Sequence, residues 1–157
     1  MGATEAVSNA RALGAKRDWV TNNLALYARV ALGAGFLSAV ADRFGYWGPP
    51  GSPKAAWGDW SNFVKYTALL NFFLPHRIAP ALAVLETIVE STLGVLLIVG
   101  VWKRQVAALA ALLLLLFALA MTLALGIKAP LDYSVFSAAG AAAMLFVWAG
   151  QEREAKE

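Results

Sequence analysis

Long apolar stretches separated by short polar segments dominate the chain. Three stretches of about 20 mostly apolar residues are long enough to cross a bilayer as helices, and a fourth is slightly shorter. These predicted spans cover residues 21–41, 79–101, 106–127 and 134–150. The third span is the clearest, because it contains the uninterrupted leucine run 112–116. The pattern therefore predicts an all-α membrane protein built as a four-transmembrane-helix bundle over residues 21–150.

The segments outside the predicted spans are polar or irregular. We assign residues 1–20 to a polar N-terminal tail and residues 151–157 to a C-terminal tail. The first loop is long, and its second half, residues 59–74, predicts an additional helix in the membrane interface or folded back over the bundle. Asp59 or Ser61 is the candidate N-cap of this helix, and Pro75 predicts its end. The other loops are short, so neighbouring spans should run antiparallel.

Tryptophan and charge positions support a membrane orientation. All six tryptophans lie at or beyond the ends of the predicted spans, as expected for an aromatic belt. With the N-terminus inside, the cytoplasmic side carries seven Lys and Arg residues and the outside carries five. The positive-inside rule therefore favours cytoplasmic termini in the inner membrane of a bacterium. Residues 39–41 resemble a signal-peptide cleavage site, but Arg29 interrupts the apolar segment, and we treat it as a span.

Composition excludes several classes of function. The chain has 157 residues, of which 60% are hydrophobic and 15% charged, so a water-soluble monomer of this size is excluded. It contains no cysteine and one histidine, which excludes disulfides, thiol relays, a bis-His haem and a multi-His metal centre within the chain. The net charge is +3 without any basic stripe, so nucleic acid is not an expected partner.

Three ionisable residues lie inside the predicted spans and are the candidates for function: Arg29, Glu86 and Glu90. Each ionised group near the middle of a bilayer costs about 2.5–3.5 kcal/mol on insertion scales. Pairing lowers that cost, and helix rise places Arg29 about 12 Å and Glu90 about 16 Å from the same membrane edge. Gly33 and Gly94 follow these two residues by one turn and permit a close approach of the helices. We therefore predict an ion pair between Arg29 and Glu90.

Glu86 has no obvious partner in this arrangement. It is protonated, or it lines a small cavity with Asn71, Asp132 or Tyr133. Three interpretations of the intramembrane polar cluster stay open. The charges hold the bundle together, they form a polar cavity for a ligand, a quinone or a proton, or they reach water on their own by snorkelling.

Further residues have simpler expected roles. Asp42 and Arg43 should form an interfacial pair in contact with solvent, and Lys128 and Asp132 a rim ion pair. The fourth span carries a small-residue face, including Ser137 and Gly140, that suits tight packing within the bundle or against another subunit.

Several segments together carry a family resemblance. These are residues 29–35 (RVALGAG), residues 86–100 (ETIVESTLGVLLIVG) with the following Lys103 and Arg104, and residues 128–137 (KAPLDYSVFS). Over about residues 20–150, the chain resembles the DoxX family of bacterial and archaeal four-helix membrane proteins, in a subgroup with a long first loop. The resemblance implies an accessory membrane subunit of a redox complex that contacts quinone or a redox partner. Only Arg29, Glu90 and Gly94 match the recurring pattern of that family, and the resemblance implies no catalytic role for them.

The expected function is therefore an integral membrane accessory subunit that supports or anchors a redox complex, with quinone as a candidate ligand of that complex. The alternative is a small-molecule transporter or binder that works as a homo-oligomer. An enzyme acting on lipid-like substrates through paired carboxylates is a third hypothesis, but the sequence favours a protein without catalytic activity of its own. We expect no cofactor or metal within the chain, contact with quinone or lipid, and partners among the bilayer lipids, other membrane subunits or further copies.

Overall fold

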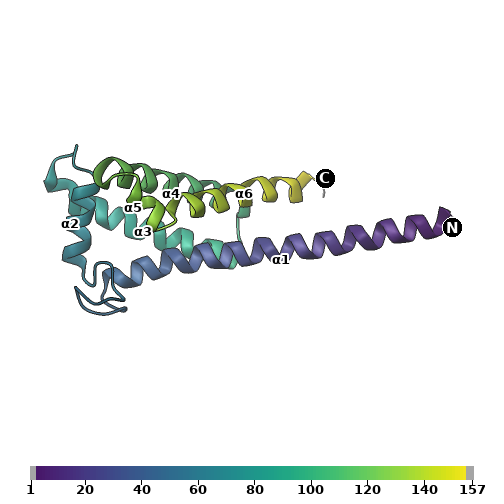
Figure 1. The fold of residues 1–157 in the computed structure, drawn as a ribbon, viewed down its shortest axis with the longest axis horizontal. Helices are drawn as coiled ribbons and strands as arrows, with labels where there is room; N and C mark the ends of the chain where they lie inside the picture. The colour runs from purple at the N-terminus through teal and green to yellow at the C-terminus, as the bar shows by residue number, and fades with distance from the viewer. Residues whose placement is uncertain (1–2, 155–157) are drawn as a thin grey trace.

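The computed structural model describes residues 3–154, and the side chains of residues 13–151. Within that range the chain is helical and contains no strand (Figure 1). The helices are α1 (Ala3–Arg43), α2 (Trp60–Leu70), the 3₁₀ turn η1 (His76–Ile78), α3 (Ala79–Val99), α4 (Lys103–Leu125), α5 (Lys128–Asp132) and α6 (Val135–Glu154). The predicted all-α class is thus confirmed.

Three of the described helices are long and apolar enough to cross a membrane. They cover Leu13–Arg43, His76–Val99 and Lys103–Leu125, and a shorter apolar helix covers Val135–Gln151. Figure 1 shows α1, α3, α4 and α6 running along one long axis, with both chain termini at the same end. Consecutive long helices therefore alternate in direction, as the short connections predicted.

Helix α1 is the longest element, with 41 residues. At 1.5 Å per residue it is about 60 Å long, twice the thickness of a bilayer core. Figure 1 shows its N-terminal part extending beyond the ends of the other helices. Residues 3–20, which the sequence assigned to a tail, continue the same helix because they are rich in alanine and contain no proline.

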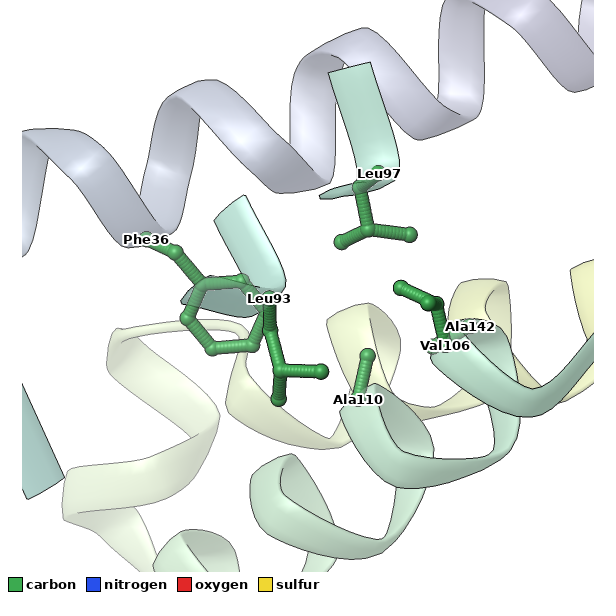
Figure 2. Packing of buried hydrophobic residues seen from close by; sticks show 6 residues of the cluster. All are labelled: Phe36, Leu93, Leu97, Val106, Ala110 and Ala142. Carbon is green, nitrogen blue, oxygen red and sulfur yellow. The ribbon is translucent and has the colours of Figure 1, made fainter. Parts of the chain in front are cut away.

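The bundle packs as two close helix pairs, α1 with α3 and α4 with α6. Small residues make the second pair close, because Ala110 and Ala142 are fully buried with 0% exposure. Figure 2 shows both alanines beside Leu97 and Val106, with Phe36 of α1 and Leu93 of α3 completing the cluster. The core thus joins all four long helices.

Helix α2 crosses the end of the bundle opposite the termini (Figure 1). The Asp59 carboxylate accepts a hydrogen bond from the Asn62 backbone N–H at 2.7 Å, which confirms Asp59 as the N-cap. The helix buries Phe63, Thr67 and Leu70 against the bundle and ends at Leu70, before the predicted stop at Pro75. The helix predicted in the first loop is thus present, and it covers the buried charges described next.

Candidate functional site

A buried ion pair joins α1 to α3 at the end covered by α2. Arg43, the last residue of α1, donates from Nη2 to Glu90 Oε1 at 2.5 Å. Its other terminal nitrogen, Nη1, donates to the Thr87 hydroxyl at 2.7 Å. Both charged residues are only 2% exposed. Each charge is therefore stabilised by the other, since neither side chain has access to water.

Two aromatic rings lie against the guanidinium of Arg43. Its central carbon lies 3.7 Å from the ring centroid of Phe63 in α2 and 5.6 Å from that of Trp57 in the first loop. A guanidinium over an aromatic face is held by the ring quadrupole as well as by dispersion. The first loop and α2 thus complete the arginine site.

Asp42 fixes the loop segment that supplies this cover. Its Oδ2 accepts hydrogen bonds from the backbone N–H groups of Ala56 at 2.9 Å and Trp57 at 2.7 Å. The residue is 4% exposed, and Arg43 is 2% exposed. The prediction that Asp42 and Arg43 form an interfacial pair facing solvent is therefore wrong, because the loop folds back and buries both side chains.

Glu86 lies one helical turn from Glu90 and is bound separately. Its Oε2 accepts a hydrogen bond from the buried Thr67 hydroxyl of α2 at 3.1 Å. Tyr66, the preceding residue in α2, has a pKa raised above its usual value by burial, and nearby Tyr133 and Glu86 raise it further. Glu86 is therefore attached to α2 through Thr67, next to Tyr66.

The other candidates for a cavity around Glu86 have different positions. The Asn71 side chain donates to the Thr67 carbonyl at 2.9 Å, within its own helix end. Asp132 pairs with Lys128 at 2.5 Å on the exposed surface, which is the predicted rim pair. Tyr133 is 71% exposed and lies near Tyr66. Glu86 thus takes Thr67 as its hydrogen-bond partner, a residue that the sequence did not single out.

The predicted pair of Arg29 and Glu90 is wrong, since Arg43 occupies that role. Arg29 lies at the far end of α3, where a Cβ on Gly100 would be 2.7 Å from its Nη2. Gly33 and Gly94 face each other, so along the axis Arg29 is eight residues, or about 12 Å, from the level of Glu90.

Side-chain direction explains further why Arg43, and not Arg29, reaches Glu90. In an α-helix the Cα–Cβ bond tilts toward the helix N-terminus. In the antiparallel pair of α1 and α3, this tilt sends Arg43 and Glu90 toward each other and sends Arg29 away from Glu90. Helix rise counted from the predicted span ends gave neither this direction nor the register of the two helices, because it placed Arg29 and Glu90 only about 4 Å apart in depth.

The four residues predicted to pack helices fall into two groups. A Cβ on Gly33 would lie 2.6 Å from the Gly94 carbonyl oxygen, so α1 and α3 meet where these glycines were expected to permit it. On α6, the face that packs inward carries Ala139, Ala142 and Leu145, whereas Ser137 and Gly140 are exposed. Ser137 and Gly140 therefore do not pack within the bundle, and their contact with another subunit stays a prediction.

The part of the chain that the structure describes shows no candidate metal site. Within it, no group of three or more His, Cys, Asp or Glu side chains is placed to hold a metal ion. The side chains at this end, which we call the Arg43 cluster, combine one cation with two carboxylates and two hydroxyl groups: Arg43, Thr67, Glu86, Thr87 and Glu90. Such an arrangement can hold helices in register or hold a proton.

Sequence reasoning missed Arg43 because it lies just outside the predicted span. The available signal was the composition of the first loop, which carries Trp47, Trp57 and Trp60 in the segment that follows the span. Aromatic rings at that density are ready partners for a cation.

Comparison with known proteins gives one match. Residues 21–132 match the family model described as methylamine utilisation protein MauE. Neither the search of curated proteins nor that of solved structures gave a match. The matched family is a different membrane protein family from DoxX, so the resemblance inferred from residues 29–35, 86–100 and 128–137 led to the wrong family. Because the match spans more than half of the chain and contains both Arg43 and Glu90, the chain belongs to the MauE family.

Proposed function

We propose that this chain is a multi-pass membrane accessory component of methylamine utilisation, without a catalytic centre of its own. The observation that carries the proposal is the family match over residues 21–132. The burial of the ion pair supports the non-catalytic part, because a substrate has no access to side chains that are 2% exposed. Of the interpretations left open by the sequence, we therefore favour the one in which the buried charges hold the helices together over the one in which they form a ligand cavity at Glu90.

The proposed membrane arrangement has four crossings. The fourth crossing would be α6, whose apolar part Val135–Gln151 has 17 residues, about 25 Å at 1.5 Å per residue, which is close to the lower limit for a transmembrane helix. Four antiparallel crossings are consistent with both termini lying at one end of the bundle (Figure 1). The bias of seven basic residues against five supports a cytoplasmic location for that end in the inner membrane.

The proposed role is to anchor or support other subunits. A chain with no cysteine supplies no thiol of its own, so any thiol chemistry in such a complex belongs to a partner. The exposed small residues Ser137 and Gly140 on α6 support a contact with another membrane helix, because small residues permit close approach. Contact with quinone stays a prediction from the sequence, and a transporter or small-molecule binder remains the alternative function.

A growth experiment in the native host tests the proposal. Deletion of the gene should abolish growth with methylamine as the sole source of carbon or nitrogen and leave growth on ammonium with another carbon source unchanged. Reintroduced wild-type gene should restore growth. Affinity purification in mild detergent should then recover at least one further membrane or redox subunit. Normal growth on methylamine after deletion would overturn the pathway assignment, and a solitary purified chain would overturn the accessory role.

A further inference from the structure

A second polar feature lies at the opposite end of the bundle, near the termini. It is a pocket of about 270 Å³ between α1, the start of α4 and the end of α6. Its polar lining comes from Asn22, Arg29, Lys103 and Trp148. No acidic residue is among the described residues that line it. The pocket is therefore cationic, and it is separate from the Arg43 cluster.

Two hydrogen-bond donors at this pocket have no partner. Arg29 Nε and the Trp148 indole Nε1 are buried atoms without a hydrogen bond among the described residues. Both groups donate hydrogen bonds and cannot accept them. Buried donors are nearly always satisfied in proteins, by protein groups or by something bound. The unsatisfied groups thus require an acceptor, and the surrounding charge favours an anionic one.

The position of the pocket suits a headgroup of the membrane. Arg29 lies against Gly100, at the end of the apolar helix α3, and Trp102 stands two residues after Gly100. Trp148 lines the same pocket, so two tryptophans lie at this level, as they do at a membrane–water interface. Arginine and tryptophan donors at the interface face the phosphate layer of the lipids.

The start of α4 adds to the attraction for anions. Helix α4 begins at Lys103, a pocket residue, and no side chain caps its N-terminus. The first N–H groups of a helix lack intrahelical partners, and the helix dipole places partial positive charge there. Phosphate groups bind at such termini for this reason.

We propose that this pocket binds a phosphate group, carried by an anionic phospholipid or present as free phosphate, through Arg29 and the Trp148 indole. Basic pockets between transmembrane helices on the cytoplasmic side accept anionic headgroups. The site is independent of the role in methylamine utilisation, since none of its polar lining residues contributes to the Arg43 cluster.

Binding to the purified, delipidated full chain in neutral detergent tests this site. Native mass spectrometry with phosphatidylglycerol and phosphatidylcholine should show retention of the anionic lipid at least tenfold above that of the zwitterionic one. Arg29→Gln should remove most of this difference, and Arg104→Gln is the matched control, because Arg104 stacks on Phe146 at 5.0 Å and does not line the pocket. Trp148→Phe keeps the ring and removes the N–H, so it provides a second readout if Arg29→Gln fails to fold.

Inorganic phosphate forms the other arm of the test. Thermal stabilisation by millimolar phosphate, lost in the Arg29 and Trp148 variants, would assign the site to free phosphate. Stabilisation by phosphatidylglycerol alone would assign it to lipid. Equal retention of the two lipids combined with no phosphate effect, or equal binding by the wild type and both pocket variants, would overturn the proposal.

Discussion

Arg43 and Glu90 are 47 residues apart in sequence and joined at 2.5 Å in a site that excludes water. The pair connects the end of α1 to the middle of α3, and α2 covers it with the ring of Phe63. A buried charge without its partner is strongly destabilising, which makes this contact the main constraint on how the first two spans pack.

Removal of the Arg43 charge should destabilise the protein strongly. Arg43→Met keeps much of the side-chain volume but leaves the Glu90 carboxylate buried and unpaired, at an expected cost of about 3–5 kcal/mol. Unfolding in mixed detergent micelles, followed by circular dichroism, measures this loss. Arg29→Met is the control, and it should cost less, because Arg29 lies at the bundle end beside Gly100. Equal losses in the two variants would contradict the assignment.

The glycine contact between α1 and α3 should tolerate no added side chain. A Cβ on Gly33 would lie 2.6 Å from the Gly94 carbonyl oxygen, so Gly33→Val must push the helices apart. Overpacking of this kind costs about 1–3 kcal/mol. The same unfolding measurement should show little change for Gly140→Ala, because no atom lies within 4 Å of a Cβ at that position. A neutral Gly33→Val would show that the two helices do not meet there.

The bond between Thr67 and Glu86 should contribute modestly to stability. Thr67→Val preserves the shape of a side chain that is 1% exposed but removes the hydroxyl that donates to Glu86. A lost hydrogen bond to a carboxylate costs about 1.5–3 kcal/mol. Thr92→Val is a matched control, since the Thr92 hydroxyl is exposed and donates only to the carbonyl of Ile88 in its own helix. A Thr67 variant as stable as the control would mean that α2 does not anchor to Glu86.

Tyr66 should ionise only in strongly alkaline solution. Its pKa is raised by burial first, and then by Tyr133 and Glu86, so the folded state retains the phenol proton more strongly than the unfolded chain does. The stability linked to this group is present below about pH 10, the usual tyrosine pKa, and is lost as pH rises through the higher folded value.

The difference between the ultraviolet titrations of wild type and Tyr66→Phe isolates this phenol. Its midpoint should lie above that of an ordinary tyrosine, and Glu86→Gln should lower it, because a neutral amide removes one cause of the shift. A midpoint at the ordinary value would place Tyr66 in solvent instead of beneath the bundle end.

The sequence predicted the helices better than the contacts between them. Apolar length and tryptophan positions identified the long helices, and the Asp59 cap identified α2, because these signals are local. The ion pair was assigned to the wrong arginine because the partner of Glu90 depends on the register of α1 against α3, which Gly33 and Gly94 set, and on side-chain tilt in an antiparallel pair.

Loop folding was the second source of error. The burial of Asp42 and Arg43 depends on a loop that returns over the span end, and bonds such as that from the Trp57 N–H to Asp42 are not visible in hydropathy. The exposure of Ser137 and Gly140 could not be predicted from the sequence either. Small residues occur on several faces of α6, so the sequence does not indicate which face packs against the bundle.

A pair of double-mutant cycles tests the central claim most directly. One cycle combines Arg43→Met with Glu90→Leu, and the other combines Arg29→Met with Glu90→Leu, all measured as free energies of unfolding in the same micelles. The Arg43 cycle should give a coupling energy of about 2–3 kcal/mol, with the double variant more stable than Arg43→Met alone, whereas the Arg29 cycle should give a coupling below about 0.5 kcal/mol. The reverse order of coupling energies would show that Glu90 is paired with Arg29 after all.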